Sequence, residues 1–136
     1  MQSQFFSIHR QGFVRVAACV PTVAVGDPRA NTEETLKLFR EGDDKNVDLM
    51  VFPELGISAY AIDDLFLQDA LLDGVEAGIA RLVEESASRS PVIIVGAPIR
   101  RNGRLIATEP STPTHQASGR AAHLHRGRST DFRLIV

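Results

Sequence analysis

The sequence predicts an α/β fold in which helices cover a largely parallel sheet. Short apolar runs rich in β-branched residues alternate along the chain with longer segments whose apolar residues recur at helical spacing. Strands that alternate with helices in this way are typical of βαβ units, which build parallel sheets. The composition, 43% hydrophobic and 24% charged among 136 residues, is that of an ordinary globular domain. We therefore expect the element order β, α, β, loop, α, β, hairpin.

Three short apolar runs predict the strands. The first two, residues 13–20 and 47–52, are rich in valine and each is followed by a proline, which ends a strand. The third, residues 91–95, is continuously apolar after its initial proline, which predicts a strand buried on both faces. An Asn-Gly pair at residues 102–103 then predicts a hairpin turn.

Two helices are predicted between these strands. Asn31 precedes Glu34 by three residues, which matches a capping box, so we expect Asn31 to cap a helix that ends near Gly42. In residues 69–85, apolar residues recur mostly at steps of three and four, which predicts a long amphipathic helix. The side chains expected on the inner faces of the two helices are Leu36, Phe39, Leu72, Val75, Ile79, Leu82 and Val83.

The overall composition excludes several classes of protein. With 15 basic and 17 acidic residues, the chain has no positive excess for nucleic acid. No apolar run approaches the roughly 20 residues that span a bilayer, and no signal peptide is recognised at the amino terminus. The single cysteine, Cys19, excludes an internal disulfide and a cysteine-rich metal site. We therefore expect a cytoplasmic protein that binds neither nucleic acid nor membrane.

The composition changes near residue 105. Residues 1–105 are net acidic and carry the strand and helix patterns, whereas residues 106–136 are net basic and hold three of the four histidines. We expect the folded part to be residues 1–105 and residues 106–136 to form a tail that the sequence specifies poorly. The tail residues that could pack lie at its very end: Phe132, Leu134, Ile135 and Val136.

Ligands of parallel sheets bind beyond the carboxyl ends of the strands, which here directs attention to residues 52–60. Glu54 lies in this segment, directly after a predicted strand. A carboxylate held there is partly desolvated and can take up a proton at neutral pH. From the spacing alone, an ion pair with an arginine or a helix cap is an equally good explanation of Glu54.

The residues of this segment resemble a known family. Phe-Pro-Glu-Leu-Gly-Ile-Ser-Ala-Tyr at 52–60 and Asp-Asp-Leu-Phe-Leu-Gln-Asp at 63–69 are similar to the amino-terminal part of the carbon–nitrogen hydrolase (nitrilase-like) superfamily. The closer match is the glutaminase domain of glutamine-dependent NAD synthetases, which residues 12–18 and 95–100 also resemble, in the same order. The resemblance covers residues 5–105. It implies part of a nitrilase-like αββα sandwich.

The resemblance also implies a function. In this family the domain hydrolyses glutamine, and the ammonia passes to a separate synthetase domain that adenylates deamido-NAD with ATP and then amidates it. ATP and deamido-NAD would bind that absent domain, so no cofactor is expected in this one. Glu54 matches the general base of the family motif, and Tyr60 matches a position near the glutamine pocket.

The other two members of the family's catalytic set have no match here. They are a lysine that stabilises the anionic oxygen of the tetrahedral intermediate and a cysteine nucleophile. The two lysines of the chain, Lys37 and Lys45, both precede Glu54, and Cys19 lies in a predicted strand as a small apolar residue. We therefore expect a truncated glutaminase domain that is inactive alone.

Alternatives to this interpretation remain open. The chain could be a non-catalytic interaction module that pairs with a full-length relative, or a fragment of another amidase or nitrilase. Self-association through an exposed helix face is a further option. Smaller features have structural explanations as their first choice: Asp63 and Asp64 would cap the next helix, and Gly96 lacks the motif of a phosphate-binding loop. Metal binding by His115, His123 and His125 and phosphate binding by Arg100, Arg101 and Arg104 are weaker hypotheses than exposure of these side chains to solvent.

Overall fold

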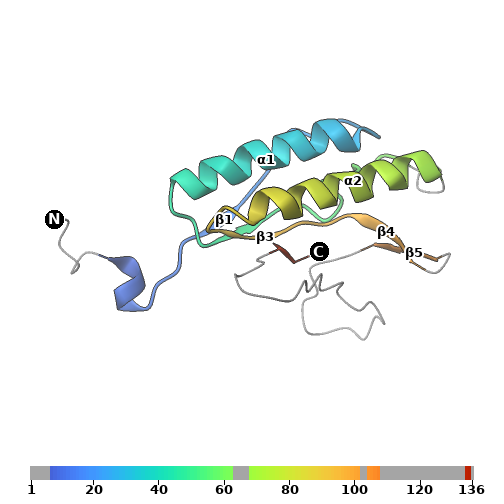
Figure 1. Ribbon diagram of the computed structural model, residues 1–136. Helices are drawn as coiled ribbons and strands as arrows, with labels where there is room; N and C mark the ends of the chain where they lie inside the picture. Colours follow the sequence, from blue (N-terminus) through green and yellow to red (C-terminus); the bar gives the residue numbers. More distant parts are fainter. Residues whose placement is uncertain (1–6, 63–67, 102–103, 108–133, 136) are drawn as a thin grey trace, which may run out of the picture.

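A four-stranded parallel sheet with two helices on one face forms the body of the protein (Figure 1). The computed structural model describes residues 7–62, 68–101, 104–107 and 134–135. The strand order is β1-β2-β3-β6, and all three neighbouring pairs are parallel, which confirms the predicted α/β class. These elements are β1 (Val16–Ala18), α1 (Pro28–Asp44), β2 (Leu49–Val51), α2 (Asp69–Ser86), β3 (Val92–Ile94) and β6 (Leu134–Ile135), and a short 3-10 helix at Ile8–Gln11 precedes them.

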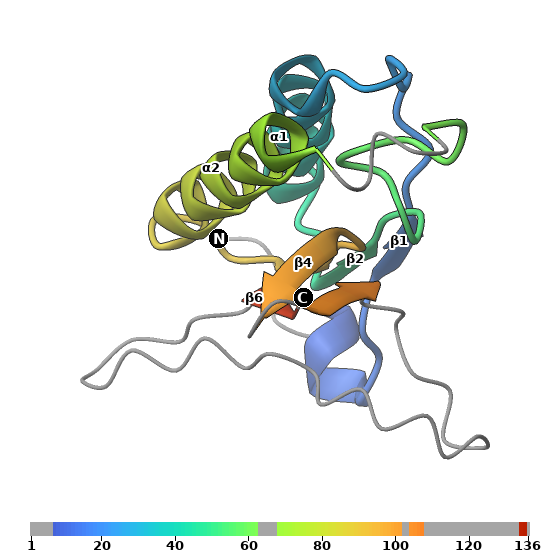
Figure 2. The ribbon, with the colours of Figure 1, turned by 90° about the vertical axis from the view of Figure 1, so that its right-hand side faces the viewer.

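Both helices cover the same face of the sheet, as two views at right angles show (Figures 1 and 2). Side chains alternate between the faces of a strand, so one residue in each of the two inner strands points to the helices. These residues are Met50 of β2 and Ile93 of β3, and both are buried. The predicted inner faces of the helices are confirmed, because the same core contains Leu36, Phe39, Val75, Ile79 and Leu82, with Val83 packed against it.

The opposite face of the sheet is not covered to the same extent by the residues that the structure describes. Val16 in β1 is 55% exposed, and the outward side chains of β2 and β3 are half-buried. The prediction of a strand buried on both faces at residues 91–95 is therefore wrong. Within β3 only Ile93 is buried, because the helices supply cover for one face alone.

The strands are also shorter than their apolar runs, at three residues in each of β1, β2 and β3. At the start of β1 the Arg15 amide donates to the Asp48 carboxylate at 2.6 Å instead of to a backbone carbonyl. Hydrophobicity extends further than the regular ladder, which is why the runs overestimate the strands.

α1 begins earlier than predicted. Asp27 is the N-cap, and its carboxylate accepts a hydrogen bond from the Ala30 amide at 3.0 Å. Pro28 follows at the first helical position, where its missing N–H leaves no partner unsatisfied. The capping role predicted for Asn31 is therefore wrong, because that residue already lies inside the helix.

α1 also continues past Gly42, its predicted end, to Asp44. Gly42 is buried beside Met50 of β2, and a Cβ at Gly42 would overlap the Met50 side chain. This glycine therefore allows a close approach of helix and sheet rather than ending the helix.

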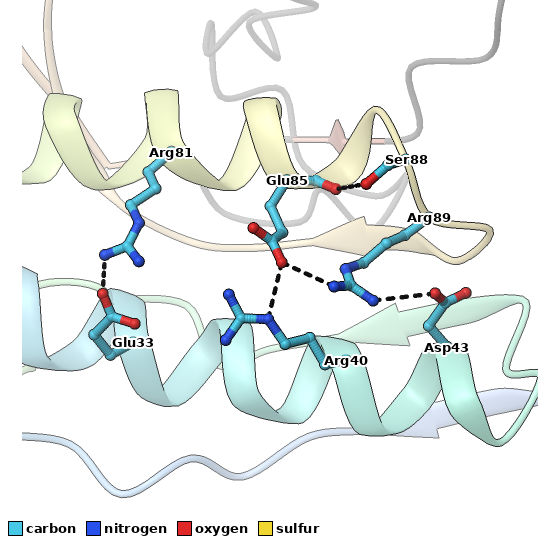
Figure 3. Close-up of polar contacts among 7 residues, drawn as sticks. All are labelled: Glu33, Arg40, Asp43, Arg81, Glu85, Ser88 and Arg89. Atoms are coloured by element: carbon cyan, nitrogen blue, oxygen red, sulfur yellow. Dashed lines mark hydrogen bonds and ion pairs between the residues drawn. The ribbon is translucent and has the colours of Figure 1, made fainter.

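Ion pairs between α1 and α2 line the side of the helix layer away from the sheet (Figure 3). The Glu85 carboxylate accepts from Arg40 Nε at 2.8 Å and from Arg89 at 2.9 Å, and Arg89 also donates to Asp43 at 3.2 Å. The hydrogen bonds from these two arginines lower the pKa of Glu85 to about 2. Nearer the other end of the two helices, Glu33 pairs with Arg81.

A β-hairpin follows the third strand, as the Asn-Gly pair predicts. β4 (Pro98–Arg101) pairs antiparallel with β5 (Arg104–Ala107), and Arg101 lies opposite Arg104, so two residues connect the strands. From the expected tail at 106–136, the structure describes the end of β5 and all of β6, which lies beside β3. The remaining residues of this tail are outside the described part of the chain, and so are Asp63 and Asp64; the N-cap residue of α2 is Gln68. None of the described helices is long and apolar enough to cross a membrane.

Candidate functional site

Glu54 lies at the carboxyl end of β2, on the segment that the sequence selects. The Phe52 amide donates to the Ile94 carbonyl at 2.9 Å, so the sheet pairing continues one residue past β2 before the chain turns at Pro53. Glu54 follows directly and is half-buried. It therefore begins the turn that follows β2, two residues beyond the last hydrogen bond of the sheet.

Gly96 lies against the backbone of Glu54, in the segment that follows the neighbouring strand β3. It lies two residues beyond β3, and a Cβ built on it would overlap the carbonyl oxygen of Glu54. Any residue other than glycine at this position would push the two backbones apart. Gly96 therefore has a packing role at the site.

The chain from Pro53 to Tyr60 folds back on itself. The Gly56 amide donates to the Pro53 carbonyl at 3.1 Å, and the Ala59 amide donates to the Leu55 carbonyl at 2.8 Å. Ala59 has a φ of 75°, a conformation that residues with a Cβ rarely adopt. This turn brings Tyr60 back to the start of the loop.

Tyr60 and Glu54 form the central contact of the candidate site. The Tyr60 hydroxyl donates to Glu54 Oε2 at 3.2 Å, and the Tyr60 side chain is 60% exposed. Partial desolvation, followed by the hydrogen bond to Glu54 and its negative charge, raises the pKa of the Tyr60 phenol. In the described residues Glu54 forms no ion pair with an arginine. The hydrogen-bond partner of its carboxylate is the Tyr60 phenol instead. A half-buried carboxylate beyond the carboxyl end of a parallel strand is placed where ligands of such sheets bind and can serve as a proton acceptor there.

Asn31 supports this loop from α1. Its side chain is 1% exposed, and its Nδ2 donates to the Ile57 carbonyl at 3.0 Å. This contact is not evident from the sequence, because Asn31 also matches a capping box. The signal that could have shown it is the competing Asp27-Pro28 cap, which leaves the Asn31 amide without a role in the helix.

In the described residues no hydrogen bond or ion pair joins Glu54 to Cys19, Lys37 or Lys45. Cys19 directly follows β1, packs against the core, and has its pKa raised by burial, which keeps the thiol protonated at neutral pH. Lys37 and Lys45 lie 3.9 Å from Glu34 and Glu41, respectively, on the exposed surface of α1 and at its C-cap. These contacts support the structural explanation of all three residues.

Of the three arginines considered for phosphate binding, the structure describes the side chain of Arg100. Arg100 keeps 36% of its side chain exposed and forms surface ion pairs with Asp69 and with Asp73, the latter at 3.3 Å. Asp69 and Asp73, in the first two turns of α2, supply the negative charges that pair with Arg100. In the part of the chain that the structure describes, no group of three or more His, Cys, Asp or Glu could hold a metal ion. The side chains of Arg101 and Arg104, and the three tail histidines His115, His123 and His125, lie outside the described part.

The fold and this site define a partial α/β domain with a carboxylate–phenol pair beyond a parallel strand. No family model matches the sequence. The chain is 48% identical over 104 residues to the glutamine-dependent NAD(+) synthetase of Mycobacterium tuberculosis and 44% identical over 104 residues to that of Mycobacterium leprae. Each match covers 76% of this chain and 15% of the relative.

A solved structure of the same kind of enzyme is also similar to this chain. The glutamine-dependent NAD(+) synthetase of Cytophaga hutchinsonii superposes with a TM-score of 0.60 at 27% identity, over 69% of this chain and 16% of that one. Over three quarters of its length, the chain is thus a homologue of the glutamine-dependent NAD(+) synthetases. It spans about 15% of the length of the curated relatives it matches.

Proposed function

We propose that this chain carries the general base of a glutamine-hydrolysing site, with Glu54 as the base and Tyr60 beside the glutamine pocket. The observation that carries the proposal is the Glu54–Tyr60 contact at the carboxyl end of β2, in a homologue of glutamine-dependent enzymes. Tyr60 engages Glu54 Oε2, so Oε1 is the oxygen assigned to proton transfer.

The proposed reaction begins when Glu54 takes the proton of a cysteine thiol. The thiolate then attacks the amide carbon of glutamine, and a lysine ammonium stabilises the resulting oxyanion. Collapse of the intermediate breaks the C–N bond, and Glu54 returns its proton to the leaving ammonia. Water then hydrolyses the thioester to glutamate. Because Cys19, Lys37 and Lys45 do not match the positions of the family's nucleophile and lysine, the proposal assigns the thiol and the ammonium to residues outside this chain and expects the chain alone to be inactive.

The remaining steps of the synthetase reaction belong to other residues under this proposal. ATP and deamido-NAD bind a synthetase domain outside this chain, and residues 1–105 contribute only to the ammonia-producing part. Residues 106–136 are not required for the proposed chemistry. Such a protein acts in the cytoplasm.

The test places this segment in an intact relative. Residues 5–105 replace the aligned segment of the Mycobacterium tuberculosis enzyme, and ammonia release from glutamine is measured. Glu54→Gln is expected to lower the rate by roughly 100- to 10,000-fold, the usual contribution of a general base. The matched control is Glu76→Gln, an exposed carboxylate on α2. A Glu54→Gln chimera as active as the control would overturn the proposal, and so would glutamine hydrolysis by the chain alone.

A second candidate function is favoured by the open face of the sheet. Val16 is 55% exposed, and the preceding Phe13 and Val14 are exposed as well, which provides apolar surface for a partner. In this alternative the chain is a non-catalytic module that pairs with a full-length relative. Size-exclusion chromatography of the mixture tests it, and separate elution of the two proteins would exclude it. The same experiment on the chain alone reports whether it self-associates.

A further inference from the structure

The side-chain amide of Asn31 joins two segments that flank the candidate site. Its Oδ1 accepts from the Ala24 amide at 2.7 Å, and its Nδ2 donates to the Ala24 carbonyl at 2.8 Å and to the Ile57 carbonyl at 3.0 Å. Ala24 belongs to the connection between β1 and α1, whereas Ile57 is in the middle of the loop from Glu54 to Tyr60. One buried side chain on the first turn of α1 therefore fixes both.

The loop needs such external support because its own geometry is strained. Ala59, directly before Tyr60, has a φ of 75°, a conformation that is unfavourable for a residue with a Cβ. The neighbouring Ser58 carbonyl accepts from the Gly26 amide at 3.2 Å, two residues beyond the Ala24 contact. Together these bonds hold the loop against the connection that precedes α1.

We propose that Asn31 is a positioning residue for the Glu54–Tyr60 pair. By holding the Ile57 carbonyl, it sets the path on which the chain turns through Ala59 and delivers the Tyr60 hydroxyl to Glu54. Its importance for catalysis rests on the proposed function, but its effect on the geometry of the pair does not.

The chemistry of the three bonds explains why the residue is an asparagine. Only an amide of this length both accepts from one backbone N–H and donates to two carbonyls. An aspartate keeps the bond from the Ala24 amide and is favourable near a helix N-terminus, but it cannot donate to Ile57. Asn31→Asp therefore removes the two bonds that the amide donates, to the Ile57 and Ala24 carbonyls, while it keeps the bond from the Ala24 amide. An alanine removes all three bonds and leaves buried backbone groups unsatisfied.

The readout is the titration of Tyr60. The chain has one tyrosine and no tryptophan, so the absorbance of the phenolate reports this side chain alone. In the wild-type chain the contact with Glu54 contributes to the raised pKa of Tyr60. Glu54→Gln removes the negative charge and defines the full effect of the pair on the titration.

Asn31→Asp and Asn31→Ala are each expected to lower the pKa of Tyr60 by most of the shift that Glu54→Gln produces. In the Glu54→Gln background the Asn31 substitutions are expected to add nothing, because the pair is already broken. The negative charge introduced by Asn31→Asp would by itself raise the pKa of Tyr60. A lowered pKa of Tyr60 in this variant therefore reports loss of the Glu54–Tyr60 contact and not the added charge. The matched control is Thr32→Val: Thr32 is equally buried, and its hydroxyl bonds Pro28 within α1.

An unchanged Tyr60 titration in folded Asn31 variants would overturn the proposal, and so would an equal shift in Thr32→Val. A second measurement needs no variant: the side-chain amide protons of Asn31 in the wild-type chain are expected to exchange slowly with solvent, and fast exchange would also overturn it. A Glu54→Gln chimera with full glutaminase activity, alongside the expected Tyr60 shifts, would reject the proposed function and leave the positioning role intact.

Discussion

The two faces of the parallel sheet differ in what covers them, although both consist of apolar side chains. On the face under α1 and α2, Met50 and Ile93 are buried, whereas on the opposite face Val16 is 55% exposed and Ile94 is half-buried. Ile93 and Ile94 are thus adjacent isoleucines of β3, yet only Ile93 is buried. The difference shows that the burial of a strand residue depends on the layer packed against its face, and not on the apolar character of the residue alone.

The largest expected loss of stability is that of an Ile93 variant, compared with the same substitution at Ile94. Ile93→Ala should destabilise the fold by about 3 kcal/mol, because it leaves a cavity between the sheet and the helices. Ile94→Ala removes the same atoms from a half-buried position and should cost about 1 kcal/mol. Urea unfolding of the two variants gives the comparison. Equal losses would mean that the open face is as well covered as the helical one.

A smaller effect is expected from the charges that join the helices over the covered face. The pKa of Glu85 is lowered to about 2 in the folded chain, so its contribution to stability is present above about pH 4.5 and is lost as the pH falls from there towards 2. Because the pair with Arg40 is partly exposed, we expect this contribution to be smaller than the loss caused by Ile93→Ala.

Thermal unfolding at several pH values measures this contribution. Glu85→Gln should be less stable than the wild-type chain at pH 7, and the difference should shrink below pH 4.5. The control is Glu76→Gln, which changes an exposed carboxylate of the same helix. A constant difference between Glu85→Gln and wild type from pH 7 to pH 2 would contradict the assignment.

The smallest effect is expected on the open face. Val16→Thr keeps the β-branched shape of a residue that is already 55% exposed, so stability should change by no more than about 0.5 kcal/mol. Urea unfolding and size-exclusion chromatography would measure stability and association together. A clear loss of stability that depends on protein concentration would show that a second chain covers this face.

The sequence was sufficient for the two helices, the first three strands and the hairpin, and for the side of each helix that packs, but it did not predict β6 within the expected tail. Periodicity identified Leu36, Phe39, Val75, Ile79 and Leu82 correctly because helix burial follows a repeat of 3.6 residues. It failed at the start of α1, where two capping patterns compete and the Asp27-Pro28 pair prevails over Asn31. The expectation for β3 failed because an apolar run does not specify how many of its faces find a partner.

The candidate site was only partly accessible to sequence reasoning. Glu54 and Tyr60 could be selected from their place after a strand and from the family resemblance. The contacts that support them could not be placed, because Asn31 and Gly96 are separated from Glu54 by 23 and 42 positions, and only the fold brings Asn31 to Ile57 and Gly96 to the Glu54 backbone. No local pattern encodes a buried amide directed at a distant carbonyl.

The contact between Gly96 and the Glu54 carbonyl has a consequence for mutational tolerance. Every other amino acid carries a Cβ, so the clash at this position arises before the polarity, charge or size of a replacement matters. A saturation scan of position 96 should therefore give a flat profile of uniformly damaging substitutions. Hydropathy and volume, which rank substitutions well at most buried sites, carry no information at this one.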